Sequence, residues 1–179
     1  MKKNILIIST SLRNNSNSEA LAEAFMEGAK SVGHQVEKVS LKGKKIEFCK
    51  GCLACQKTGH CIIQDDAGEL VRKMLHADVL VFATPIYYYE MSGQMKTLID
   101  RANPLYSADY AFRQVYLLTT AAEEDIHAMD GALKGLQGFV DCYEKLSLAG
   151  TVFAGGVDNP GEIKSHKALE KAYQLGCEV

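Results

Sequence analysis

The segment Asn4-Ile5-Leu6-Ile7-Ile8-Ser9, with the polar segment Thr10-Ser11-Leu12-Arg13-Asn14-Asn15-Ser16-Asn17-Ser18 after it, decides the fold of this chain. Four consecutive aliphatic side chains in so short a run are typical of a strand buried on both faces, as in a parallel sheet. The polar segment leads into residues 21–32, where apolar side chains recur at helical spacing. The chain is therefore predicted to open with a strand, a loop and a helix.

The same alternation of aliphatic runs and amphipathic patterns continues to the end of the chain. The last helix is expected to begin with Asn159 as its N-cap and Pro160 in its first turn, and to end near Gly176. Together with right-handed crossovers, five such strand–helix units predict one doubly wound parallel sheet with helices on both faces. We expect residues 1–179 to form a single domain. Strands are expected at Asn4–Ser9, His34–Leu41, Asp78–Thr84, Gln114–Thr119 and Leu146–Ala154.

Composition excludes several classes of protein. The 179 residues are 47% hydrophobic and 23% charged, which is ordinary for a folded protein and wrong for a disordered one. A formal net charge of −2 gives no basic surface for nucleic acid. No apolar stretch has the length of a membrane span, and four aliphatic residues are too few for a secretory signal. We therefore expect a cytoplasmic protein without nucleic-acid or membrane partners.

Three loops are expected to meet at the carboxyl ends of the strands, where doubly wound sheets bind their ligands: residues 10–18, 84–92 and 119–125. The first is rich in hydroxyl and amide side chains, contains Arg13, and precedes a helix N-terminus, which suits a phosphate group. It has neither G-x-G-x-x-G nor the Lys-Ser/Thr pair of a P-loop. A phosphate monoester, as in a mononucleotide cofactor, therefore fits better than a dinucleotide or a nucleoside triphosphate.

The loop over residues 84–92 contains three consecutive tyrosines, Tyr87, Tyr88 and Tyr89. Successive side chains cannot all face the core, so aromatic surface is expected at the edge of the ligand site. Pro85 is expected to end the preceding strand. Exposed tyrosines suit either a flat heteroaromatic ring or a subunit interface.

Four cysteines form the pattern C-x2-C-x2-C-x5-C at Cys49, Cys52, Cys55 and Cys61. Such closely spaced thiolates resemble the ferredoxin-type run that wraps one iron–sulfur cluster. Alternatively, these cysteines pack or act as thiols. Zinc fits less well, because zinc sites usually separate two cysteine pairs by a longer loop.

Two further features receive structural interpretations. Asp66 followed by Glu69 resembles a capping box at the start of a helix. The adjacent Asp100 and Arg101 are expected to form an ion pair that supports the fold or an interface.

The motifs together resemble the NADPH-dependent FMN reductase family, and more narrowly its iron–sulfur flavoprotein branch. The resemblance covers about the first two-thirds of the chain. The first loop has Thr10-Ser11-Leu12-Arg13 where the family often has Gly-Ser-Pro-Arg, which leaves the backbone donors of this loop open. The resemblance rests on Ser11-Leu12-Arg13 with Asn17-Ser18, Cys49-Lys50-Gly51-Cys52 through Cys61 with Asp65-Asp66, Thr84-Pro85-Ile86-Tyr87, Met91-Ser92-Gly93-Gln94-Met95-Lys96, and Ile99-Asp100-Arg101.

This resemblance implies a flavodoxin-like three-layer sandwich with strand order 2-1-3-4-5 and non-covalently bound FMN. It implies no catalytic acid or base. It places the FMN phosphate at Ser11, Arg13, Asn17 and Ser18, the ribityl chain and ring at Pro85, Ile86, Tyr87 and Tyr88, and the other edge of the ring at Thr119, Thr120 and Ala121.

The resemblance also implies electron transfer from NAD(P)H or a ferredoxin-type donor, through FMN, to a small acceptor. In the iron–sulfur branch, the cysteines corresponding to Cys49, Cys52, Cys55 and Cys61 bind a [4Fe–4S] cluster that passes electrons to FMN. A homodimer or homotetramer is expected. The alternative function is that of a non-enzymatic FMN electron carrier.

Overall fold

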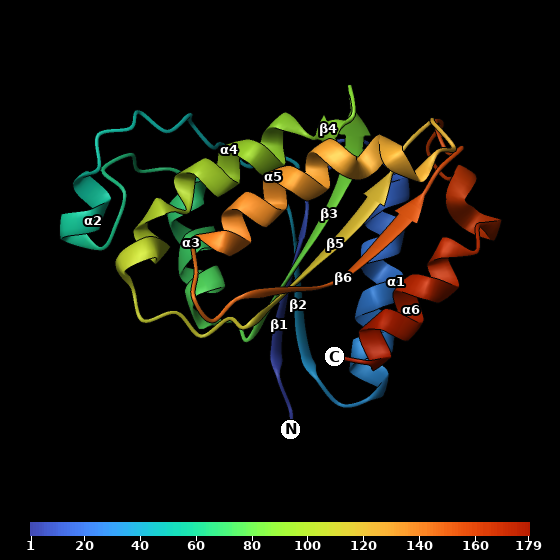
Figure 1. Cartoon of the computed structure of the whole chain (residues 1–179), viewed down its shortest axis with the longest axis horizontal. Helices are drawn as coiled ribbons and strands as arrows, with labels where there is room; N and C mark the ends of the chain where they lie inside the picture. Colours follow the sequence, from blue (N-terminus) through green and yellow to red (C-terminus); the bar gives the residue numbers. More distant parts are fainter.

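A computed structural model describes the whole chain, Met1–Val179, as one parallel sheet between two layers of helices (Figure 1). The parallel strands lie in the order β2-β1-β3-β5-β6. A short strand β4 (Glu90–Met91) pairs antiparallel with the end of β3. Without this addition the order is the expected 2-1-3-4-5, so the predicted fold is confirmed. The parallel strands are β1 (Asn4–Ser9), β2 (Gln35–Ser40), β3 (Val79–Tyr87), β5 (Gln114–Thr120) and β6 (Ser147–Ala154).

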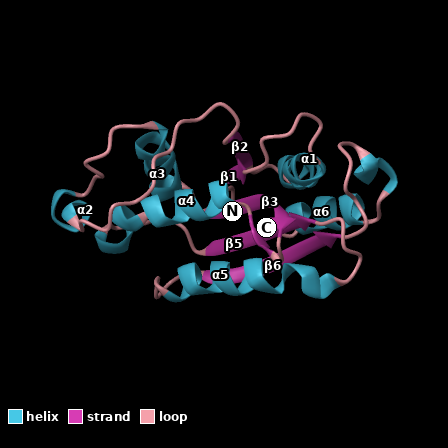
Figure 2. Ribbon diagram, turned by 90° about the horizontal axis from the view of Figure 1, so that it is seen from above, coloured by secondary structure: helices cyan, strands magenta, loops and turns pink.

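Helices α1 (Asn17–Ser31) and α6 (Ala168–Cys177) cover one face of the sheet, and α3 (Asp66–His76), α4 (Gly93–Arg101) and α5 (Asp130–Asp141) cover the other (Figure 2). No helix is both long enough and apolar enough to cross a bilayer. The remaining helical turns are α2 (Ala54–Thr58) and the 3-10 helices η1 (Asn103–Ser107), η2 (Ile126–Met129) and η3 (Glu162–Ser165).

Strand β1 lies at the centre of this packing. Ile5 and Ile7 join the apolar cluster beneath α1 and α6, while Leu6 and Ile8 join the cluster beneath α3, α4 and α5. All four side chains are buried. The run is aliphatic without alternation because both faces of the strand are covered.

The C-terminal helix ends at Cys177, next to Gly176 as predicted, but its start differs from the prediction. Asn159 and Glu162 do bond to each other, but they precede only the short helix η3, and α6 begins at Ala168. Gly176 lies inside α6, where a Cβ atom would come within 2.2 Å of the carbonyl oxygen of Phe25. Its function is thus to let α6 approach α1 closely, and not to end the helix.

Two other element boundaries are corrected. Asp65, and not Asp66, is the N-cap of α3, because its carboxylate accepts a hydrogen bond from the amide of Ala67. Pro85 does not end β3. It pairs in register with Thr120, and β3 continues to Tyr87, because the last residues of the strand form the hairpin with β4.

Arg101, at the end of α4, is the largest fully buried side chain. The predicted Asp100–Arg101 pair is wrong: Asp100 pairs with Lys96, and Arg101 pairs with Asp65 through two hydrogen bonds of 2.6 and 2.9 Å. Burial opposes ionisation of Asp65, but the bonds from Arg101 and from the amides of Glu47 and Ala67 outweigh it and lower the pKa of this carboxyl group.

We expect Arg101→Met to lower the free energy of unfolding by about 3–5 kcal/mol, because it leaves the buried Asp65 carboxylate without its countercharge. Chemical denaturation measures this change. The control is Arg72→Met on α3, whose arginine makes no ion pair and is exposed; it should change stability by less than about 0.5 kcal/mol. Equal effects of the two substitutions would contradict the assigned importance of the buried pair.

Candidate functional site

The first turn of α1 lies directly after the loop that follows β1. Ser16 caps this helix by accepting a hydrogen bond from the amide of Glu19, and its hydroxyl lies 3.0 Å from that of Ser18. The amides of Asn17 and Ser18 donate to no group of the chain. Ser11 and Ser18 are buried beside them. Free amides and hydroxyls at the positive end of a helix suit an anion.

The side chain of Asn17 has partners of its own. Its amide nitrogen donates to the carbonyl oxygens of Val157 (3.4 Å) and Asn159 (2.9 Å). Its amide oxygen accepts from the backbone amides of Gly161 (3.0 Å) and Ile163 (3.3 Å). Asn17 therefore attaches the loop after β6 to the N-terminus of α1, and only its backbone amide remains free.

A cavity of about 300 Å³ lies at the carboxyl ends of the strands, beside this helix terminus. The three predicted loops meet there. Among the predicted residues, Ser18 and Thr119 do not line it: Thr119 is buried and donates to the carbonyl oxygen of Val152. The predicted residues that line the cavity are Ser11, Arg13, Asn17, Pro85, Ile86, Tyr87, Tyr88, Thr120 and Ala121.

A fourth loop, after β6, completes the wall of the cavity with Val157, Asp158 and Pro160, which the sequence reasoning missed. The Arg13 guanidinium donates to the carbonyl oxygen of Asp158 at 2.7 Å and so joins the first loop to the fourth. The sequence did contain a signal for this fourth loop, because the loop also follows the carboxyl end of a predicted parallel strand.

Buried hydroxyl groups hold the first and second loops together below the cavity. The Thr10 hydroxyl donates to the carbonyl oxygen of Ala83 (3.1 Å) and lies 2.9 Å from the Ser92 hydroxyl. The amide of Ser92 donates to the Thr84 hydroxyl at 3.0 Å. These bonds fix the spacing between the α1 terminus and the hairpin that carries the tyrosines.

The β3–β4 hairpin presents the tyrosines at the edge of the cavity. Tyr88 and Tyr89 form its two-residue turn and both have positive φ, at 50° and 64°, as in a type I′ turn. Tyr88 is fully exposed. Gly131 of α5 lets the turn approach, since a Cβ atom there would lie 2.3 Å from the carbonyl oxygen of Tyr89. Bulky residues rarely adopt this backbone conformation, and strain of this kind gathers at functional sites.

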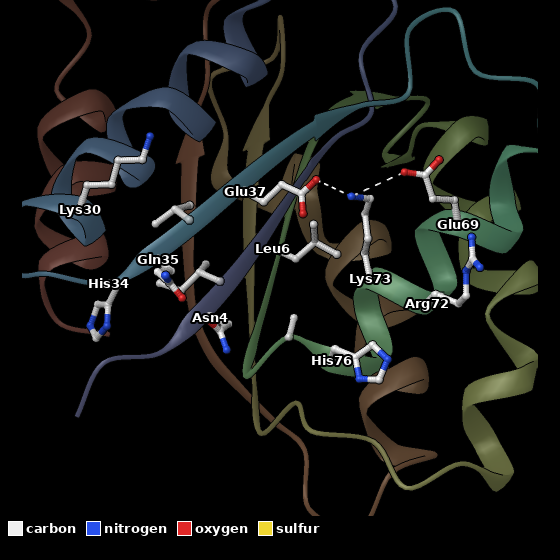
Figure 3. A pocket seen from close by; sticks show the side chains of 13 residues that line it. Asn4, Leu6, Lys30, His34, Gln35, Glu37, Glu69, Arg72, Lys73 and His76 are labelled. Atoms are coloured by element: carbon white, nitrogen blue, oxygen red, sulfur yellow. Dashed lines mark hydrogen bonds and ion pairs between the residues drawn. The ribbon is translucent and has the colours of Figure 1, made fainter.

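A larger cavity, of about 850 Å³, lies at the opposite ends of the strands between α1 and α3 (Figure 3). Charged side chains surround it, and Lys73 pairs there with Glu37 and Glu69. It is not the candidate site, because ligands of doubly wound sheets bind at the carboxyl ends of the strands.

The cysteine loop lies away from the candidate site at the carboxyl ends of the strands, at the end of the molecule that carries α2 (Figure 1). All four of its cysteines are free: Cys49 and Cys52 are exposed, Cys61 is half-buried and Cys55 is buried. No group of three or more His, Cys, Asp or Glu side chains is arranged to hold a metal ion. The donor chemistry therefore fits an iron–sulfur cluster, but the four sulfur atoms do not converge in this structure.

The sequence profile of the family described as NADPH-dependent FMN reductases matches residues 3–144. An iron–sulfur flavoprotein of Archaeoglobus fulgidus is 31% identical over 166 residues, which are 91% of this chain and 72% of that protein. A second iron–sulfur flavoprotein of this organism is 39% identical over 100 residues, 56% of this chain and only 49% of that protein.

Among solved structures, azoreductase from Bacillus anthracis superposes with a TM-score of 0.74 at 17% identity, with 100% of each chain covered. At this identity the likeness concerns the fold alone. The profile match, in contrast, extends from β1 into the segment after α5 and so contains three of the four loops around the cavity. On this evidence the chain belongs to the NADPH-dependent FMN reductase family and is an FMN-dependent oxidoreductase.

Proposed function

We propose that this chain binds FMN in the four-loop cavity and transfers electrons from a reduced nicotinamide nucleotide, through FMN, to a small acceptor. The observation that carries the proposal is the position of the cavity. The free amides of the α1 terminus lie at one side of the cavity, and the β3–β4 hairpin with Tyr87 and Tyr88 lies at the other. This separation matches a cofactor with an anionic tail and a flat apolar ring.

In the proposed complex, the phosphate accepts hydrogen bonds from the free backbone amide of Asn17 and from the hydroxyl of Ser11, both of which line the cavity. Ser18 lies beneath this lining, with its hydroxyl 3.0 Å from that of Ser16. Arg13 lies at the edge of the cavity and adds positive charge. The Asn17 side chain acts indirectly, by fixing the fourth loop against the helix terminus.

The ring of FMN then lies between the hairpin, at Ile86, Tyr87 and Tyr88, and the loop after β5, at Thr120 and Ala121. When bound, FMN supplies the chemistry of hydride and electron acceptance. The chain contributes orientation and the exclusion of water, and no side-chain acid or base is required. The exposed face of Tyr88 suits a second copy of the chain, consistent with a homodimer or homotetramer.

We further propose that Cys49, Cys52, Cys55 and Cys61 hold a [4Fe–4S] cluster as a second redox centre. Support comes from four free thiols in one short loop and from relatives named iron–sulfur flavoproteins. Since the sulfur atoms do not converge in this structure, the loop has to close around the metal.

With FMN bound, the protein should oxidise NADPH or NADH in steady state when a quinone is supplied as acceptor. Absorbance of the nucleotide measures the turnover. Reduction of the bound flavin by dithionite, with no reaction with either nucleotide, would instead identify an electron carrier or an enzyme with a ferredoxin-type donor.

Replacing Ser11 by alanine should weaken FMN binding by about tenfold, because the substitution removes one hydrogen bond to a charged phosphate. Flavin fluorescence quenching measures the dissociation constant.

The matched control is Ser31→Ala at the opposite end of α1, whose hydroxyl donates to the carbonyl oxygen of Gly28. This variant should bind FMN as the wild type does. Unchanged affinity in the Ser11→Ala variant would show that the phosphate lies elsewhere.

Protein purified without air should contain about four iron and four sulfide per chain and absorb broadly beyond the flavin bands. Cys49→Ser should abolish or strongly reduce both, because it removes one ligand. Cys142→Ser, outside the loop, should leave both unchanged. A spectrum with flavin bands alone would contradict the cluster.

A further inference from the structure

The end of α4 and the start of η1 lie next to the cysteine loop, and Asn103 contacts one of its four thiols. The side-chain amide nitrogen of Asn103 donates to the sulfur of Cys55 at 3.2 Å. Cys55 is 8% exposed, whereas Cys49 and Cys52 are exposed to solvent. Nothing in the proposed electron transfer requires a buried hydrogen bond between an amide and a thiol at this point.

Arg101, which precedes Asn103 by two residues, also contacts the cysteine loop. Its guanidinium donates to the carbonyl oxygens of Glu47 (2.7 Å) and Ile63 (3.2 Å), which are the residues on either side of the segment 48–62. With Asp65 it therefore closes this segment at its base. All four cysteines lie within the segment.

The guanidinium also retains an unused donor. Its Nε is buried and has no hydrogen-bond partner. Cys61 and Arg101 line the same cavity of about 550 Å³. A buried donor of this kind is costly unless something accepts its hydrogen, and a sulfur ligand with negative charge is a suitable acceptor.

We infer that Asn103 and Arg101 are positioning residues that hold Cys55 and Cys61 as a preformed half of the cluster site, over which Cys49 and Cys52 close when metal binds. The inference rests on the proposed cluster. It accounts for the unequal burial of the four cysteines and for the unpaired Nε. Gly51 and Leu53, on either side of the exposed Cys52, both have positive φ.

The test uses Asn103→Leu, which keeps the size of the side chain and removes the donor. The metal-free chain is treated with iodoacetamide, and the rate at each cysteine is read by peptide mass spectrometry. In the wild type we expect fast reaction at Cys49 and Cys52 and slow reaction at Cys55. The variant should accelerate Cys55 alone, by about tenfold.

Two further variants complete this measurement. Arg101→Lys keeps a positive charge near Asp65 but loses the planar donor set, and should accelerate Cys61 while leaving Cys49 and Cys52 unchanged. Gln137→Leu, which removes an exposed amide on α5, should change no cysteine. Equal rates at Cys55 in Asn103→Leu and the wild type would overturn the inference.

Cluster reconstitution supplies a second readout. At limiting iron, Asn103→Leu should take up iron and sulfide about tenfold less readily than the wild type, while its FMN content stays unchanged. If the wild type takes up iron and sulfide but Asn103→Leu does so equally well, the positioning function fails and the cluster stands. If the wild type takes up neither, the cluster proposal itself fails, and the preformed half-site with it.

Discussion

The burial of β1 on both faces is the constraint on which the site depends. Because Ile5 and Ile7 pack beneath one helical layer and Leu6 and Ile8 beneath the other, the strand is held between β2 and β3 with no freedom to shift its register. A shift by one residue would exchange the two sets of side chains. The carboxyl end of β1, and with it the first turn of α1, is thereby fixed beside the end of β3.

The loops around the cavity are joined to this fixed point by side chains that have no chemical function of their own. Thr10 joins the first loop to β3 and Ser92, and Asn17 joins it to the loop after β6. The free amides of α1 can bind an anion only while these loops stay in place. The polar residues buried at this edge thus divide into those that face the cavity and those that position it.

The sequence was sufficient for features encoded in neighbouring residues. Short apolar segments, three of them nearly continuous aliphatic runs, predicted all five parallel strands, and the rule for doubly wound sheets then brought three loops together. It was insufficient where partners lie far apart: Arg101 and Asp65 are 36 positions apart, and Asn17 and Gly161 are 144 apart. Local periodicity carries no information on such pairs, so Arg101 was assigned to its neighbour Asp100 and the fourth loop was missed.

The buried Arg101 also anchors the cysteine loop to the domain. The loop leaves the domain after Glu47 and returns at Ile63, and the guanidinium binds both points together with the N-cap of α3. Both ends of the segment 48–62 are thus held at one point of the domain. The proposed FMN cavity lies at the carboxyl ends of the strands, and none of its lining residues belongs to the segment 48–62. The two proposed redox centres can therefore be tested separately, because they share no side chain.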